Sequence, residues 1–142
     1  MRLDWTRAAA LAATFLVTAW GCGSPSEHPE TVPVQGKVSY KGAPVPKGTI
    51  SFQSDGGEVA IGEIQPDGTY KLSTFAEEDG AVPGHAKVSV VANTGDPNMM
   101  PGSSPGYTPP KDLVPKKYNK PETSGLEANV TKGGPPVDFD LK

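Results

Sequence analysis

The chain has 142 residues, among them 17 glycines, 16 prolines and one cysteine, and its formal net charge at pH 7 is −3. This length suffices for one domain but not for two. An acidic chain whose lysines are spread along the sequence argues against nucleic acid as a partner, and a lone cysteine excludes an internal disulfide.

The first residues have the layout of a secretory signal. Arg2 and Arg7 precede an apolar run at residues 8–20, and Gly21 and Cys22 close it. Such a charged start, apolar middle and small-residue end are typical of a signal peptide. The run is too short for the ~20 residues that a membrane-spanning helix needs. We therefore expect residues 1–21 to be a cleaved signal peptide.

Cys22 directly follows the small residue, which resembles a bacterial lipoprotein signal. The resemblance implies acylation of the Cys22 thiol, with palmitate among the chains, and a protein held on the extracytoplasmic side of a membrane. Gly21 fits the lipoprotein pattern and Ala19 is tolerated, whereas Trp20 is unusual. An ordinary secretory signal and an uncut signal anchor are the alternatives.

The segment after the cysteine is small, polar and rich in proline. Residues 22–31 show no apolar periodicity, so we expect a flexible tether. Residues 32–142 then form the folded domain.

That domain is predicted to consist of short strands separated by turns. Residues 34–40 alternate between apolar and polar types, which is typical of a half-buried strand. Pro66-Asp67-Gly68 is a strong turn signal and predicts a hairpin. About seven strands with frequent turns predict an all-β fold, an antiparallel seven-stranded β-sandwich. We expect the strands near residues 34–40, 49–52, 59–64, 69–72, 85–92, 126–130 and 137–141.

The apolar positions of these strands give a predicted core. No stretch has helical apolar spacing over ten residues. The expected core residues are Val34, Val38, Tyr40, Ile50, Phe52, Val59, Ile61, Tyr70, Leu72, Val88, Val90, Leu126, Val130, Phe139 and Leu141.

Several motifs resemble a known group of domains. The run at residues 34–52 is similar to the opening of carboxypeptidase-regulatory-like, transthyretin-like domains, and residues 66–70 are similar to their Asp-Gly-x-aromatic turn. With the motifs at residues 114–118 and 123–126, and with the lipoprotein signal, the chain resembles small envelope lipoproteins of planctomycete-type bacteria. The resemblance covers nearly all of residues 32–142. It implies a prealbumin-like sandwich at the cell envelope and no defined activity.

A long segment rich in proline and glycine, at about residues 94–115, is the part least typical of a sandwich. Loops of this length are usually functional or disordered. Met99, Met100 and Tyr107 would be exposed apolar groups there, and such groups can mark a partner-contact loop. A proline-rich, partly disordered loop without any partner is the favoured interpretation.

The sequence offers no catalytic or metal-binding constellation. A nucleophile needs a neighbouring base and an orienting group, yet the chain after residue 21 has only His28 and His85 and no arginine. We therefore expect no enzyme activity, no cofactor and no zinc site. A calcium site at residues 77–79, with help from Asp55 or Asp96, lacks the usual ligand spacing, so a solvated acidic turn is favoured. A Lys37–Asn129 isopeptide is not expected either, because strand alternation points both side chains to solvent.

The resulting hypothesis is a lipid-anchored β-sandwich with a non-catalytic binding or structural role at the cell envelope. Its partner would be an envelope protein or a cell-wall polysaccharide. One alternative is an accessory domain that assists an envelope hydrolase in trans. Another is a carbohydrate-binding module, for which only Tyr107 and Tyr118 could provide exposed aromatic platforms.

Overall fold

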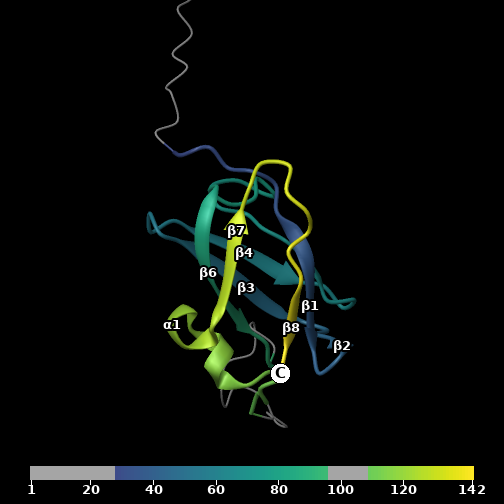
Figure 1. The fold of residues 1–142 in the computed structure, drawn as a ribbon. Helices are drawn as coiled ribbons and strands as arrows, with labels where there is room; N and C mark the ends of the chain where they lie inside the picture. The colour runs from purple at the N-terminus through teal and green to yellow at the C-terminus, as the bar shows by residue number, and fades with distance from the viewer. Residues whose placement is uncertain (1–27, 96–108) are drawn as a thin grey trace, which may run out of the picture.

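The computed structural model describes residues 28–95 and 109–142. They form two β-sheets that pack face to face (Figure 1). In the first sheet β1 (Gln35–Tyr40) pairs with three short strands, β2 (Ala43–Pro44), β5 (Thr69–Lys71) and β8 (Phe139–Leu141). The second sheet has the order β4 (Val59–Ile64), β3 (Gly48–Ser54), β6 (Gly84–Val91) and β7 (Leu126–Val130). Two short helical turns, η1 (Lys116–Asn119) and α1 (Pro121–Ser124), precede β7.

The core lies between the two sheets and contains most of the residues expected from the sequence. Alternation along β1 and β3 turns every second side chain inward. Val34, Tyr40 and Leu126 are only partly buried and pack against the edge of the core. The largest fully buried side chains are Tyr70, Phe52, Ile50, Leu72, Leu141, Val38, Val88 and Val90.

The prediction for Val59 and Ile61 was wrong. The strand lies where it was expected, but these side chains face outward and are 43% and 53% exposed. Ala60, Gly62 and Ile64 face the core instead. A Cβ on Gly62 would lie 2.6 Å from the carbonyl oxygen of Lys71, so the inner face of β4 needs small residues where β5 approaches. Val59 and Ile61 therefore reflect the preference of β-branched residues for strands rather than burial.

The sandwich is not wholly antiparallel, which corrects the predicted fold class. β8 runs parallel to β1, with Val38 opposite Phe139 and Tyr40 opposite Leu141. The chain leaves the end of β7, crosses to the first sheet and reaches β1 near its start, where the Val137 N–H donates to the Gln35 carbonyl at 2.9 Å. β8 then follows β1 in the same direction.

The described residues contain eight strands where seven were expected, because the two-residue β2 closes the turn after β1. The predicted hairpin around Asp67 forms only in part. Hydrogen bonds link Gln65 to Thr69 beside the turn and Ile61 to Ser73 further along, but β5 pairs with β1 and belongs to the other sheet. This connection therefore bends the chain around one edge of the sandwich, and β5 continues into the first sheet.

Candidate functional site

Four of the residues singled out from the sequence, Cys22, Met99, Met100 and Tyr107, lie outside the described residues. The flanks of the predicted 94–115 loop are described, and they are paired. The Thr94 N–H donates to the Lys111 carbonyl at 2.9 Å, and the Leu113 N–H donates to the Ala92 carbonyl at 2.8 Å. Val114 is buried in the core. Residues 111–114 thus belong to the folded framework rather than to a free loop.

Tyr118 does not provide the exposed aromatic platform considered for a sugar-binding site. The side chain is 5% exposed, and its hydroxyl donates to the Lys142 carbonyl at 2.9 Å. The single turn of η1 rotates the ring inward, against the expectation from sequence. Tyr118 therefore serves packing.

In the acidic turn at residues 77–79, two of the three carboxylates, those of Glu78 and Asp79, have partners within the described residues. Asp79 accepts backbone N–H groups from Thr74 at 2.6 Å and from Phe75 and Ala76 at 2.9 Å each. Burial opposes the charged form of Asp79, but these three hydrogen bonds outweigh it, so the pKa of the carboxyl group is lowered. Glu78 pairs instead with Lys71 at 3.0 Å. In the described part of the chain, no three His, Cys, Asp or Glu side chains come together as a metal site.

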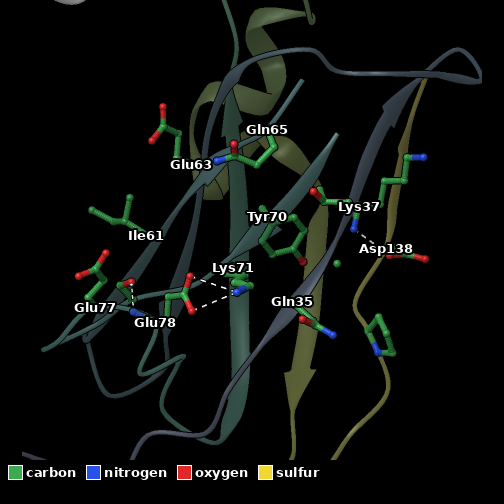
Figure 2. Close-up of a pocket in the computed structure, with 14 residues that line it drawn as sticks. Gln35, Lys37, Ile61, Glu63, Gln65, Tyr70, Lys71, Glu77, Glu78 and Asp138 are labelled. Carbon is green, nitrogen blue, oxygen red and sulfur yellow. Dashed lines mark hydrogen bonds and ion pairs between the residues drawn. The ribbon is translucent and has the colours of Figure 1, made fainter. Parts of the chain in front are cut away.

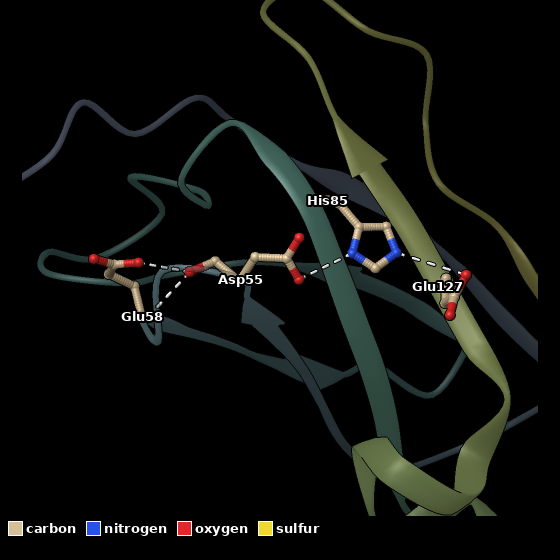
Figure 3. A network of polar contacts seen from close by, with 5 residues as sticks. Asp55, Glu58, His85 and Glu127 are labelled. Carbon is tan, nitrogen blue, oxygen red and sulfur yellow. Dashed lines mark hydrogen bonds and ion pairs between the residues drawn. The ribbon is translucent and has the colours of Figure 1, made fainter.

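His85 lies between two carboxylates on the outer face of the second sheet (Figure 3). Its Nδ1 is 3.1 Å from Asp55 Oδ1, and its Nε2 is 3.6 Å from Glu127 Oε2. Hydrogen bonding to Asp55 is the main cause that raises the pKa of the imidazole. Both ring nitrogens face carboxylates, and among the described residues no hydroxyl group hydrogen-bonds to the ring. A nucleophile–base pair is therefore not formed at His85.

Lys37 and Asn129 are both exposed, and they lie on strands of different sheets. Neither is placed for the buried crosslink that the sequence analysis considered and rejected.

A groove of about 790 Å³ is lined by residues of β1, β4 and β5 (Figure 2). One bank carries Ile61, Glu63, Glu77 and Glu78, and the other carries Gln35, Lys37 and Asp138. Tyr70 lies beneath the groove with its hydroxyl donating to the Val137 carbonyl. Tyr70 is 1% exposed, so it forms the floor of the groove, and burial, assisted by the negative charge of Asp138, raises the pKa of this phenol.

The groove combines net negative charge with one exposed apolar side chain. Four carboxylates line it against two lysines, and Lys71 is already paired with Glu78. Ile61 is the most exposed of the large hydrophobic residues described, and Figure 2 shows it between Glu63 and Glu77. A second groove of about 780 Å³ adjoins the first through Gln35, Lys71 and Asp138 and continues along β7.

Comparisons with known proteins give no match. No protein-family model, no curated protein and no solved structure is significantly similar to the chain. The resemblance to carboxypeptidase-regulatory-like domains therefore rests on the motifs alone and stays a hypothesis. Among the described residues, no helix has the length and apolar character needed to cross a membrane.

The groove could not be expected from the sequence, because its lining comes from five separate segments, at residues 35–37, 61–65, 69–73, 77–78 and 136–138. Two glycines within alternating strands were the available signal, since a glycine there often marks a close backbone approach. A Cβ on Gly36 would collide with the Val137 carbonyl, and a Cβ on Gly62 would meet Lys71. These positions mark where the chain crosses from one sheet to the other and leaves the groove open.

Proposed function

We propose that this protein is a lipid-anchored extracytoplasmic β-sandwich that binds a protein partner at the cell envelope without catalysing a reaction. The observation that carries the binding role is Ile61, an exposed apolar side chain flanked by carboxylates in an open groove. Apolar patches rimmed by polar residues are typical of interaction sites, and Ile61 lines an adjoining hollow together with Val91, which is 39% exposed. The chemistry of the groove fits an extended segment with basic and apolar side chains.

The lipid anchor is supported by the sequence around Cys22 and by the place where folding begins. Of the described residues, Val32 is the first that is buried, and its N–H donates to the Ala81 carbonyl at 2.9 Å. His28 already stacks on Phe75, with ring centres 4.4 Å apart, and Glu30 pairs with Lys132 at 2.8 Å. The six residues 22–27 could span about 20–22 Å if fully extended, which lets the domain stand clear of a membrane surface.

An accessory role beside an envelope hydrolase is compatible with the same groove, because it too requires a protein partner. Sugar binding by stacking is not favoured at the groove, because Tyr70 is its only aromatic lining residue and is buried.

Two experiments test the proposal. Replacing Cys22 with serine should release the protein from membranes, and mass spectrometry should find an acylated cysteine at the mature N-terminus of the wild type. An unacylated N-terminus overturns the anchor.

For the binding role, a photo-crosslinking amino acid at position 61 in living cells should yield a discrete adduct. The same group at position 59, which is on the same exposed face but outside the groove, should not. The adduct should disappear when either Glu63 or Glu77 is changed to lysine and persist in the matched single reversal Glu122→Lys on α1. An adduct that persists in the Glu63 and Glu77 variants would contradict this binding site.

A further inference from the structure

The lysines, which are dispersed along the sequence, gather at one end of the folded domain. Strands run alternately toward two ends of the sandwich, so the connections also divide into two groups. In the described part of the chain, the lysine end comprises residues 41–47, 65–68, 92–95, 109–125 and 142, and Figure 1 shows it as the end that carries β2, α1 and the C terminus. Its lysines are Lys41, Lys47, Lys111, Lys116, Lys117, Lys120 and Lys142.

At the opposite end, where the chain enters the domain, acidic residues outnumber lysines. This end comprises residues 28–34 and the connections at 55–58, 72–83 and 131–138, in which Lys132 is the only lysine. The described acidic residues there are Glu30, Asp55, Glu58, Glu77, Glu78, Asp79 and Asp138, whereas the lysine end has Asp67, Asp112 and Glu122. The charge of the domain is therefore separated along its length, although its net charge is negative.

The lysine end is held together by contacts with the framework. Lys47 Nζ donates to the Thr94 carbonyl at 2.9 Å, which joins two of its connections. Lys117 Nζ lies 4.6 Å from the centre of the Tyr118 ring, and the Tyr118 hydroxyl binds the Lys142 backbone. The lysines are thus presented on neighbouring segments with a fixed backbone.

Little of this positive charge is neutralised within the described residues. All seven lysines are exposed, and one of them forms an ion pair, Lys116 with Asp112 at 3.7 Å. The Lys116 side chain is 83% exposed in that pair, so water screens the interaction strongly. A concentration of like charge of this kind attracts polyanions over several ångströms.

We propose that the lysine end binds an anionic glycan polymer of the cell envelope, one that carries carboxylate or phosphate groups. Lysine ammonium groups act as mobile point charges on such groups, and a repeating polyanion can engage several lysines together. The choice of an envelope polymer rests on the extracytoplasmic location proposed above. The contact uses charge, so it needs no exposed aromatic platform, and it is separate from the groove at Ile61.

A glycan is favoured over a lipid surface by two features of the described residues. The lysine end lies opposite residues 28–34, where the chain enters the domain, so the end nearest to the predicted anchor is the acidic one. Large apolar side chains beside the lysines would strengthen binding to a membrane surface. Of the exposed large hydrophobic residues described, the aromatic one, Phe75, lies at the other end, and Val91 alone borders the lysine end.

The test uses the full-length protein in nanodiscs of phosphatidylcholine, with polygalacturonate as the anionic glycan and dextran as the neutral one. Lys111→Gln, Lys116→Gln and Lys120→Gln together remove three charges from the lysine end. The matched control, Lys37→Gln, Lys87→Gln and Lys132→Gln, removes the same charge elsewhere on the surface. Affinity is measured at low and at physiological salt, in parallel with vesicles of phosphatidylglycerol.

We expect binding to polygalacturonate that weakens with salt, no binding to dextran, and an affinity about tenfold lower for the lysine-end variant. The control should change by less than about twofold. Equal losses in both variants would show an effect of net charge alone and overturn the proposal, as would no binding to polygalacturonate. Preferential binding to phosphatidylglycerol would assign the surface to lipid instead. Polymer binding is measured in vitro. A failure of this proposal can therefore be distinguished from a failure of the anchor or of the Ile61 groove.

Discussion

The ring of Phe139 meets the ring of Phe52 edge-on, with the ring centres 5.9 Å apart and the planes inclined by 75°. Phe52 lies on β3 in the middle of the second sheet, and Phe139 begins β8, the last strand of the first sheet. The contact thus joins the end of the chain to the opposite layer. Aromatic pairs in this arrangement stabilise a core beyond the area that they bury.

Replacing Phe139 with alanine should lower the free energy of unfolding by about 3–5 kcal/mol, because it removes a buried ring and leaves a cavity. The ring is 8% exposed. The matched change Phe75→Ala removes a ring that is 42% exposed, and it should cost less than about 1 kcal/mol. Urea denaturation of both variants measures the difference. Similar losses would show that β8 does not depend on this contact.

The Tyr70 hydroxyl should matter for both stability and its dependence on alkaline pH. Tyr70→Phe leaves the Val137 carbonyl without its hydrogen bond, which should cost about 1 kcal/mol. The pKa of Tyr70 is raised mainly by burial, so its contribution is complete below the unfolded pKa of about 10 and is lost as pH rises above it.

Wild-type protein should consequently lose more stability than Tyr70→Phe between pH 9 and pH 11, measured by denaturant unfolding at each pH. Tyr40→Phe is the control, because among the described residues the Tyr40 hydroxyl has no hydrogen-bond partner. Equal alkaline losses in wild type and in Tyr70→Phe would rule out the proposed role of the buried phenol.

Much of the fold could be predicted from strand alternation. The longest strand at residues 85–92 and the strand at residues 126–130 were placed within one residue, and the inward positions of β1 and β3 were confirmed. Both central strands alternate large apolar and polar residues, so the period of two is unambiguous. The all-β class follows from this local pattern.

The sequence could not predict which side chains of β4 point into the core, or that β8 runs parallel to β1. Both features depend on contacts between distant segments. Ile61 has the residue type of a core position, but the approach of Lys71 to Gly62 decides which face is inside. β8 is parallel because its connection crosses between sheets near Gln35. The groove and the lysine end have the same origin, since each combines segments that are far apart in the sequence.

Asp79 should stabilise the connection between β5 and β6 through its three backbone hydrogen bonds. Asp79→Ala should therefore lower the free energy of unfolding by about 1–2 kcal/mol. The pKa of Asp79 is lowered, so its contribution is present above an unfolded pKa near 3.9 and is lost as pH falls through the folded value. Glu77→Ala, an exposed neighbour, is the control and should change stability by less than about 0.5 kcal/mol.

The same variants distinguish a hydrogen-bonded turn from a calcium site. A chelator should leave the melting temperature of the wild type unchanged, since Asp79 already uses both carboxylate oxygens on backbone N–H groups. A fall of several degrees on adding the chelator, reversed by calcium and absent in Asp79→Ala, would instead identify a metal site at this turn.

His85 should make the second sheet more stable at mildly acidic than at mildly alkaline pH. Its position between Asp55 and Glu127 favours the protonated ring, and its pKa is raised, first by the hydrogen bond to Asp55. A raised folded pKa means that the contribution is complete below the unfolded value of about 6.5 and is lost as pH rises through the folded value.

Nuclear magnetic resonance titration of the ring protons should find His85 titrating above about 6.5, and Asp55→Asn should move the midpoint down. In denaturant unfolding, the difference in stability between wild type and His85→Gln should be larger at pH 5.5 than at pH 8.5. The two carboxylates remain in His85→Gln, so the comparison isolates the charge of the ring. A His85 midpoint that does not respond to Asp55→Asn, or a stability difference that grows with pH, would contradict the assigned ion pairs.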